Sequence, residues 1–221
     1  NNGLCIGATE NFRPDQNDGD DPNKMYDYSA RGGALTSGGR IKPDLVNVGT
    51  AKMSTFSRGE WDYNVASSLG NPQPGYIMEV DQYSYLTGDP GQDARPDYRY
   101  MTGSSVACPD AAGCYAMIRE YIQKIGGNAN PSSTLPKAML INGAEKQTEA
   151  LYQYPGYDQG WGRINIKNSL FPDLPTTVQK ATNIFTMTGS WSPSFNMNVT
   201  AGTPLKVTIA WKDVRTPPGQ L

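Results

Sequence analysis

The residues most capable of catalytic chemistry lie in a Gly-Ser-Ser turn, Gly103-Ser104-Ser105. The turn runs into small residues and then into an apolar segment over residues 114–122. Apolar side chains recur along this stretch at helical spacing, which predicts a long, mostly buried helix that begins at the turn. The positions expected to face the core are Ala112, Tyr115, Ala116, Ile118 and Ile122. Pro109 is expected early in the helix, where its missing N–H costs little.

A serine at the start of a helix has two interpretations. In the structural one, Ser104 or Ser105 caps the helix, because its hydroxyl oxygen accepts a hydrogen bond from a free backbone N–H. In the catalytic one, the serine is a nucleophile, and the helix N-terminus offers N–H groups and partial positive charge to an oxyanion. The small neighbours Gly103 and Ala107 would let a substrate backbone approach closely. Taken alone, the turn favours the cap.

Four further stretches favour the catalytic interpretation over the helix cap. They read Cys-Ile-Gly-Ala-Thr-Glu at residues 5–10, Tyr-Ser-Ala-Arg-Gly at 28–32 with Gly-Arg-Ile-Lys-Pro-Asp-Leu at 39–45, Val-Gly-Thr at 48–50, and Gly-Trp-Gly-Arg-Ile-Asn at 160–165. Together with the serine turn, these stretches resemble, in the same order, signature segments of the subtilisin-like serine peptidases, or subtilases. The resemblance covers roughly residues 3 to 170.

In this resemblance Ser105 takes the place of the nucleophile, and its backbone N–H is one oxyanion donor. Gly103 and Ser104 belong to the oxyanion and substrate-binding turn. Two positions depart from the family pattern, since Ser104 stands where Thr is usual and Val48 stands where Pro is usual.

The resemblance implies an α/β fold over residues 1–170, namely part of a subtilisin-like parallel sheet with flanking helices. Residues 170–175 have the composition of a linker, and alternating apolar residues at 184–188, 195–199 and 205–211 predict strands. Residues 171–221 are similar to the start of the β-sandwich (jelly-roll-like) domain that follows the catalytic domain in some larger subtilases.

Shorter signals predict further elements along the chain. Strands are expected at residues 3–8 and 52–56, and residues 42–46 are expected to lead into another strand. A hairpin is expected at 76–80 and 82–86, a second helix ending at 142–143, and a tight turn at 158–162. Arg31 is expected to pair with a carboxylate and to hold the turn around it.

The chain contains no histidine. A serine hydroxyl is a poor nucleophile without an adjacent base, and the Ser-His-Asp arrangement needs His for that task. In subtilases the Asp, the His and the oxyanion Asn all precede the segment that residues 5–10 resemble. The resemblance therefore implies a serine endopeptidase component, acting on peptide or protein substrates, that is completed by an amino-terminal half of the domain on a second chain.

Two other functions stay open. One is a non-catalytic subtilase-like module with a binding or structural role, which the departures at Val48 and Ser104 permit. The other is a sedolisin-type peptidase, in which Glu replaces His and would also lie upstream.

The charge pattern argues against nucleic acid and an anionic membrane as partners, and it leaves a calcium site possible. A net charge of −2 gives no reason to expect nucleic acid or an anionic membrane, and no apolar run of about 18 residues is present to span one. No cofactor is required and no metal-ligand spacing is present. Residues 15–21 carry four carboxylates, which suit either a structural calcium loop or a solvated acidic loop.

The cysteines and one glycosylation sequon indicate the cellular compartment in which the protein is expected. Cys5, Cys108 and Cys114 are expected to be buried free thiols, with Cys108 and Cys114 on different faces of the helix. The resemblance implies a secreted protein. Asn198-Val199-Thr200 is then a glycosylation candidate, although the pattern is also common by chance.

Overall fold

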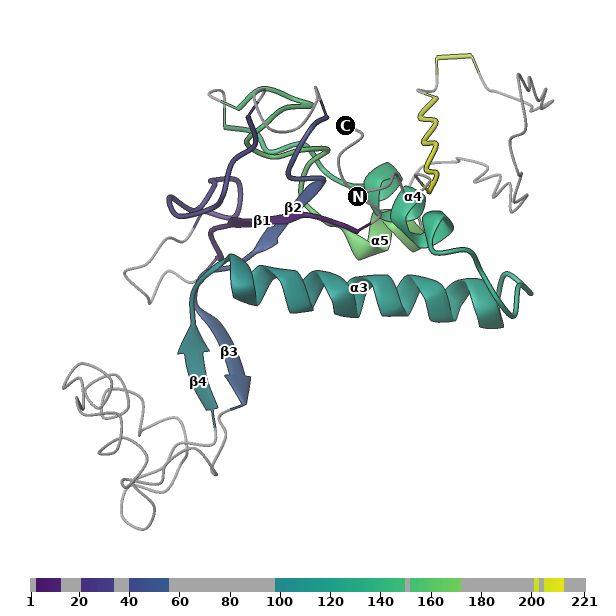
Figure 1. Cartoon of the computed structure of the whole chain (residues 1–221), viewed down its shortest axis with the longest axis horizontal. Helices are drawn as coiled ribbons and strands as arrows, with labels where there is room; N and C mark the ends of the chain where they lie inside the picture. Colours follow the sequence, from purple (N-terminus) through teal and green to yellow (C-terminus); the bar gives the residue numbers. More distant parts are fainter. Residues whose placement is uncertain are drawn as a thin grey trace, which may run out of the picture.

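The computed structural model describes residues 3–12, 21–33, 40–55, 98–149, 152–171, 201–202 and 205–212. In Figure 1 two short strands, β1 and β2, lie across one long helix, α3, and two smaller helices, α4 and α5, lie beside it. Most of the acidic stretch 15–21, the predicted hairpin at 76–86, the predicted strands at 184–188 and 195–199, and Asn198 lie outside the described residues.

A parallel pair of strands forms the sheet at the centre of the described part. β1 (Ile6–Thr9) pairs with β2 (Leu45–Val48), with Ile6 opposite Leu45 and Thr9 opposite Val48. β1 starts three residues later than predicted, whereas β2 starts where residues 42–46 were expected to lead into a strand. Before the ladder, the Asp44 carboxylate accepts the N–H of Cys5 at 2.8 Å. The two strands are nearly fully buried, as expected of a parallel pair.

An antiparallel pair leads the chain from the sheet to the serine turn. β3 (Lys52–Thr55) pairs with β4 (Tyr98–Met101), and Lys52 lies opposite Met101. The predicted strand at 52–56 is therefore confirmed. This pairing brings the loop after β2 next to the residues that precede α3.

The long helix is α3 (Ser104–Lys124), and only one of its sides is buried. The buried residues are Ala107, Ala111, Ile118 and Ile122. The prediction of a mostly buried helix is thus wrong for Ala112 and Ala116, which are exposed. The physical reason is that the sheet, α4 and α5 pack on a single face of α3.

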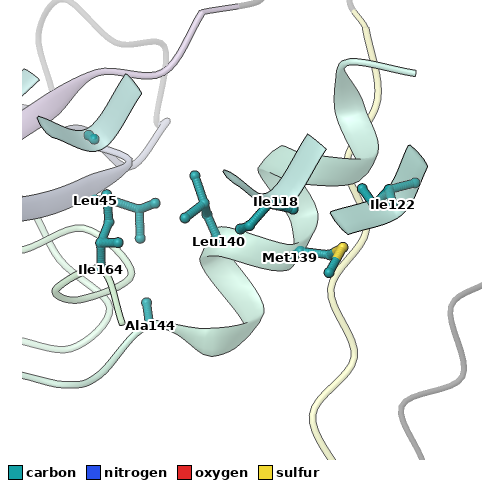
Figure 2. Close-up of a cluster of buried hydrophobic side chains, with 8 residues drawn as sticks. Leu45, Ile118, Ile122, Met139, Leu140, Ala144 and Ile164 are labelled. Carbon is teal, nitrogen blue, oxygen red and sulfur yellow. The ribbon is translucent and has the colours of Figure 1, made fainter. Parts of the chain in front are cut away.

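The hydrophobic core lies between this face, the sheet and α4 (Thr134–Gly143). Figure 2 shows Leu140 of α4 between Leu45 of β2 and Ile118 of α3, with Met139 beside Ile122. The second helix was predicted, and it ends at Gly143 as expected. Helix α5 (Ile166–Leu170) is the last helix among the described residues.

The turn at residues 158–162 is confirmed and is tied to a distant segment. Gly160 and Gly162 have positive φ angles of 59° and 103°, which favour glycine. Arg31 pairs with Asp158 at 2.5 Å, which confirms the prediction that it pairs with a carboxylate. The Arg31 guanidinium also lies 5.5 Å from the centre of the Tyr152 ring.

The structure does not confirm the all-β sandwich. Residues 205–212 form no strand with any other described segment. The division at residue 170 stays a prediction, because residues 172–200 are not described.

The end of β2 and the start of α3 meet at glycines. Gly103 donates its N–H to the Gly49 carbonyl at 2.7 Å. A Cβ atom on Gly49 would lie 2.7 Å from Cβ of Ala8 and 2.8 Å from the Gly103 carbonyl oxygen. Only a residue without a side chain allows this approach.

We expect Gly49→Ala to lower the free energy of unfolding by about 1–3 kcal/mol, because the added methyl group has no space. Gly113→Ala is the matched control, since a Cβ there meets nothing within 4 Å. It should raise stability by roughly 0.5–1 kcal/mol, because alanine costs less backbone entropy in a helix. Urea unfolding followed by circular dichroism measures both, and a harmless Gly49→Ala would contradict the close contact.

Candidate active site

Ser105 lies in the first turn of α3, but neither serine caps the helix. The N-cap is Gly103, and it makes no side-chain cap. Its carbonyl instead accepts the N–H groups of Val106 at 3.0 Å and Ala107 at 3.3 Å. The predicted serine cap is therefore wrong: the helix starts at Ser104, so both serines are its first two residues rather than the flanking one.

The Ser105 side chain is exposed, and its hydroxyl has no hydrogen-bond partner among the described residues. The N–H groups of Ser104 and Ser105 likewise find no acceptor within those ranges. Free N–H groups at a helix start, with the positive end of the helix dipole, form a site for a developing negative charge. The turn therefore places an accessible hydroxyl beside N–H groups of the kind that can bind an oxyanion.

Gly103 keeps the space around this hydroxyl open. Its φ of 149° is a conformation that residues with a side chain rarely adopt. A Cβ atom there would lie 3.2 Å from the Ser105 Oγ. Both the backbone conformation and the short distance to the Ser105 hydroxyl therefore favour glycine at this position.

Pro109 is the sixth residue of α3, later than the sequence suggested. A residue at this position would normally donate its N–H to the carbonyl of Ser105, four residues earlier. Proline has no such N–H, so the helix loses that bond. The Ser105 carbonyl is consequently freed from the helical ladder.

The loop after β2 connects the serine turn to the end of β1. Thr50 is fully buried, and its hydroxyl accepts the N–H of Asn11 at 2.9 Å. The next residue, Ala51, donates its N–H to the Thr102 hydroxyl at 3.1 Å. Three chain segments are thus fixed to one another immediately beside Ser105.

A carboxylate that the sequence analysis did not single out fixes the second turn of α3. Asp110 accepts hydrogen bonds from Asn47 of β2 at 2.9 Å and from Lys52 of β3 at 2.7 Å. It therefore joins the helix to both sheets. The signal available in the sequence was a lone acidic residue among the small residues after the serine turn.

A second ion pair lies at the carboxyl end of β1. Glu10 is 6% exposed and pairs with Lys24 at 2.8 Å. The hydrogen bond from Lys24 to Glu10, and then the charge of Glu10, raise the pKa of Lys24. This carboxylate is thus already paired. In the part of the chain that is described, no side chain is bonded to the Ser105 hydroxyl as a base would be.

Neither a metal site nor a membrane span is found in the described ranges. No group of three or more His, Cys, Asp or Glu residues there could hold a metal ion. The calcium loop at residues 15–21 stays a prediction, because most of it is not described. No described helix is both long enough and apolar enough to cross a membrane.

The cysteines are free, but two of them are not buried. Cys5 and Cys108 are exposed, and Cys114 is partly buried. The prediction of buried thiols is wrong for Cys5 and Cys108. Cys108 is exposed because it points away from the Ala107–Ala111 side of α3 that meets the sheet. For Cys5, which directly precedes β1, the structure offers no specific reason.

We expect Asp110→Ala to lower the free energy of unfolding by about 1–3 kcal/mol, chiefly because the amide of Asn47, only 6% exposed, loses its acceptor. Glu120→Ala is the control, since it removes only an exposed pair with Lys124 one helical turn away. Urea unfolding compares the two. Equal effects would show that Asp110 does not join the helix to the sheets.

Alkylation by iodoacetamide should be slower at Cys114 than at Cys108, which lies on the same helix and is exposed. Burial, and then the charge of Asp110, raise the pKa of Cys114. A raised pKa leaves less thiolate at pH 8, and the thiolate is the reactive form. Peptide mass mapping over time measures both rates, and faster reaction at Cys114 would contradict its partial burial.

A sequence model of the Subtilase family matches residues 1–162. A serine protease/ABC transporter B family protein, tagA of Dictyostelium discoideum, is 27% identical over 195 residues, or 80% of this chain. The chain spans only 10% of that relative.

Among solved structures, the CspB protease of Clostridium perfringens aligns with 74% of this chain and 25% of its own, at 20% identity and a TM-score of 0.43. The family match covers most of the 221 residues and includes the serine turn, β1 and β2. The chain belongs to the subtilase family.

Proposed function

We propose that this chain is the serine-bearing component of a subtilisin-like endopeptidase, with Ser105 as the nucleophile. The observation that carries the proposal is the open Ser105 hydroxyl on the first turn of α3, next to the free N–H groups of Ser104 and Ser105. Membership of the subtilase family supports it. So does the similarity to a relative whose name includes serine protease.

The reaction would follow from this placement. The Ser105 Oγ attacks the carbonyl carbon of a peptide bond while a base accepts its proton. The N–H of Ser105 donates to the resulting oxyanion. The intermediate then expels the amine, which takes a proton from the base, and water hydrolyses the acyl-enzyme. Peptides or proteins are the proposed substrates.

The proposed base is a histidine from outside these 221 residues, because the Ser-His-Asp arrangement uses His and the chain has none. We propose that an associated amino-terminal half of the domain supplies the His, the Asp and the oxyanion Asn. The outer face of α3 supports this. Ala112, Gly113, Ala116 and Met117 are exposed there, on a helix whose opposite side forms the core. Such an apolar face is typical of a surface that another segment covers.

A fluorophosphonate probe tests the proposal, because it labels serines that a base has activated. The chain is labelled alone and together with a subtilase amino-terminal half that carries Asp, His and Asn. We expect labelling only in the complex, loss of labelling in Ser105→Ala, and retained labelling in Ser104→Ala. Peptide mass mapping identifies the modified residue.

Each other outcome overturns a different part of the proposal. Labelling of the isolated chain at Ser105 would mean that these 221 residues contain a base. A folded complex that is not labelled would favour the non-catalytic module, with the subtilase fold kept for binding. Labelling at a different serine would remove Ser105 from the reaction.

A further inference from the structure

The corner between β2 and β3 contains a residue in a conformation that is rare for its type. Ala51 lies between the two strands and has a φ of 45°. It is the only residue other than glycine with a positive φ in the part of the chain that the structure describes. In this left-handed conformation the Cβ atom comes too close to the following carbonyl oxygen, so the conformation is unfavourable for alanine. Strain of this kind is found most often at active sites.

Side chains of two other segments hold both peptide groups of Ala51. Its N–H donates to the hydroxyl of Thr102, which follows β4, at 3.1 Å. Its carbonyl accepts the side-chain amide of Asn11, two residues after β1, at 3.3 Å. Ala51 is only 4% exposed, so a peptide group here that lost its partner could not readily bond to water instead.

The residues on either side of Ala51 are also bonded to other segments. The hydroxyl of Thr50 accepts the backbone N–H of Asn11 at 2.9 Å, and Thr50 is fully buried. On the other side, Lys52 pairs with Asp110 of α3 at 2.7 Å. The surroundings therefore over-determine the conformation of this corner, which is the condition under which a strained residue persists.

The corner in turn holds the two residues that precede α3. Gly103 donates its N–H to the Gly49 carbonyl at 2.7 Å, and Thr102 accepts the N–H of Ala51. In Figure 1 β3 and β4 extend away from the β1–β2 sheet near the first turn of α3. A change in the φ of Ala51 would move one of these two anchors relative to the other. The turn that carries Ser105 would move with them.

We propose that Asn11, Ala51 and Thr102 form a strained clamp that positions Ser105. Asn11 and Thr102 hold Ala51 in the left-handed conformation, and Ala51 in that conformation fixes the serine turn. The three are positioning residues, because they act on Ser105 through the turn. The inference rests on the proposed function, in which Ser105 is the nucleophile.

A rescue experiment in the full chain tests the clamp. Thr102→Val removes the hydroxyl that accepts the Ala51 N–H, and Thr102→Ser, which keeps it, is the matched control. Hydrogen exchange measured by NMR follows the N–H of Gly103, which is bonded to Gly49 and not to Thr102. We expect Thr102→Val to speed this exchange about three- to tenfold, which corresponds to the loss of one hydrogen bond, and Thr102→Ser to leave it unchanged.

The second substitution separates strain from the simple loss of a bond. Glycine adopts a positive φ without cost, so Ala51→Gly should keep the corner in place without the Thr102 hydroxyl. We therefore expect the double variant, Ala51→Gly with Thr102→Val, to restore the slow exchange at Gly103. The N–H of Ile118, in the middle of α3, is the internal reference for unfolding of the whole helix.

The rate at which a fluorophosphonate labels Ser105, in the complex with a subtilase amino-terminal half, tests the positioning role. We expect labelling to slow in Thr102→Val by about the same factor as the exchange rises, and to recover in the double variant. Unchanged exchange in Thr102→Val, or no recovery in the double variant, would overturn the clamp. Exchange that changes while labelling rates stay equal would overturn the positioning role.

Failure of the proposed function gives a different result. The unsubstituted chain would then not be labelled in the complex, and the positioning role would fall with the function. The exchange at Gly103 does not depend on catalysis, so it would still show whether Ala51 holds the turn.

Discussion

The structure depends on the close approach between the end of β2 and the start of α3. Gly49 lies against Ala8 on one side and against the Gly103 carbonyl on the other, and no side chain fits between them. This contact fixes the helix N-terminus at the carboxyl ends of the two parallel strands. In open parallel sheets that end is where functional sites usually form. Glycines, which have no side chain, therefore position the serine turn as much as side-chain contacts do.

In the candidate site, backbone groups and side chains therefore have separate roles. The N–H groups proposed to bind the oxyanion belong to the first helical turn, so they are in place wherever α3 is folded against the sheet. The hydroxyl is held by the same turn. In the proposed reaction the proton acceptor is absent from the described residues, and a side chain of another segment could supply it without rearranging these N–H groups.

Much of this arrangement could be predicted from the sequence, because glycines and small residues mark the turns where the chain must pack closely. The helix after Ser105, the Arg31 pair and the turn near Gly160 all carry such local signals. The spacing correctly placed Ile118 and Ile122 on the buried face of α3, but the burial of Ala107 and Ala111 and the role of Asp110 could not be predicted. They depend on which sheet residues, such as Asn47, happen to face the helix, and spacing along one segment does not contain that information.

The pairing of early with late segments also constrains how the chain folds during synthesis. Arg31 and Asp158 are 127 residues apart, and Arg163 donates to a carbonyl 141 residues earlier, at Pro22. Such distant contacts form slowly. At a translation rate of about 5–20 residues per second, Pro22 waits roughly 7–28 s for Arg163 to be added. During that interval the strand β2 lacks its later neighbour Arg163, so its edge stays open until that segment is made.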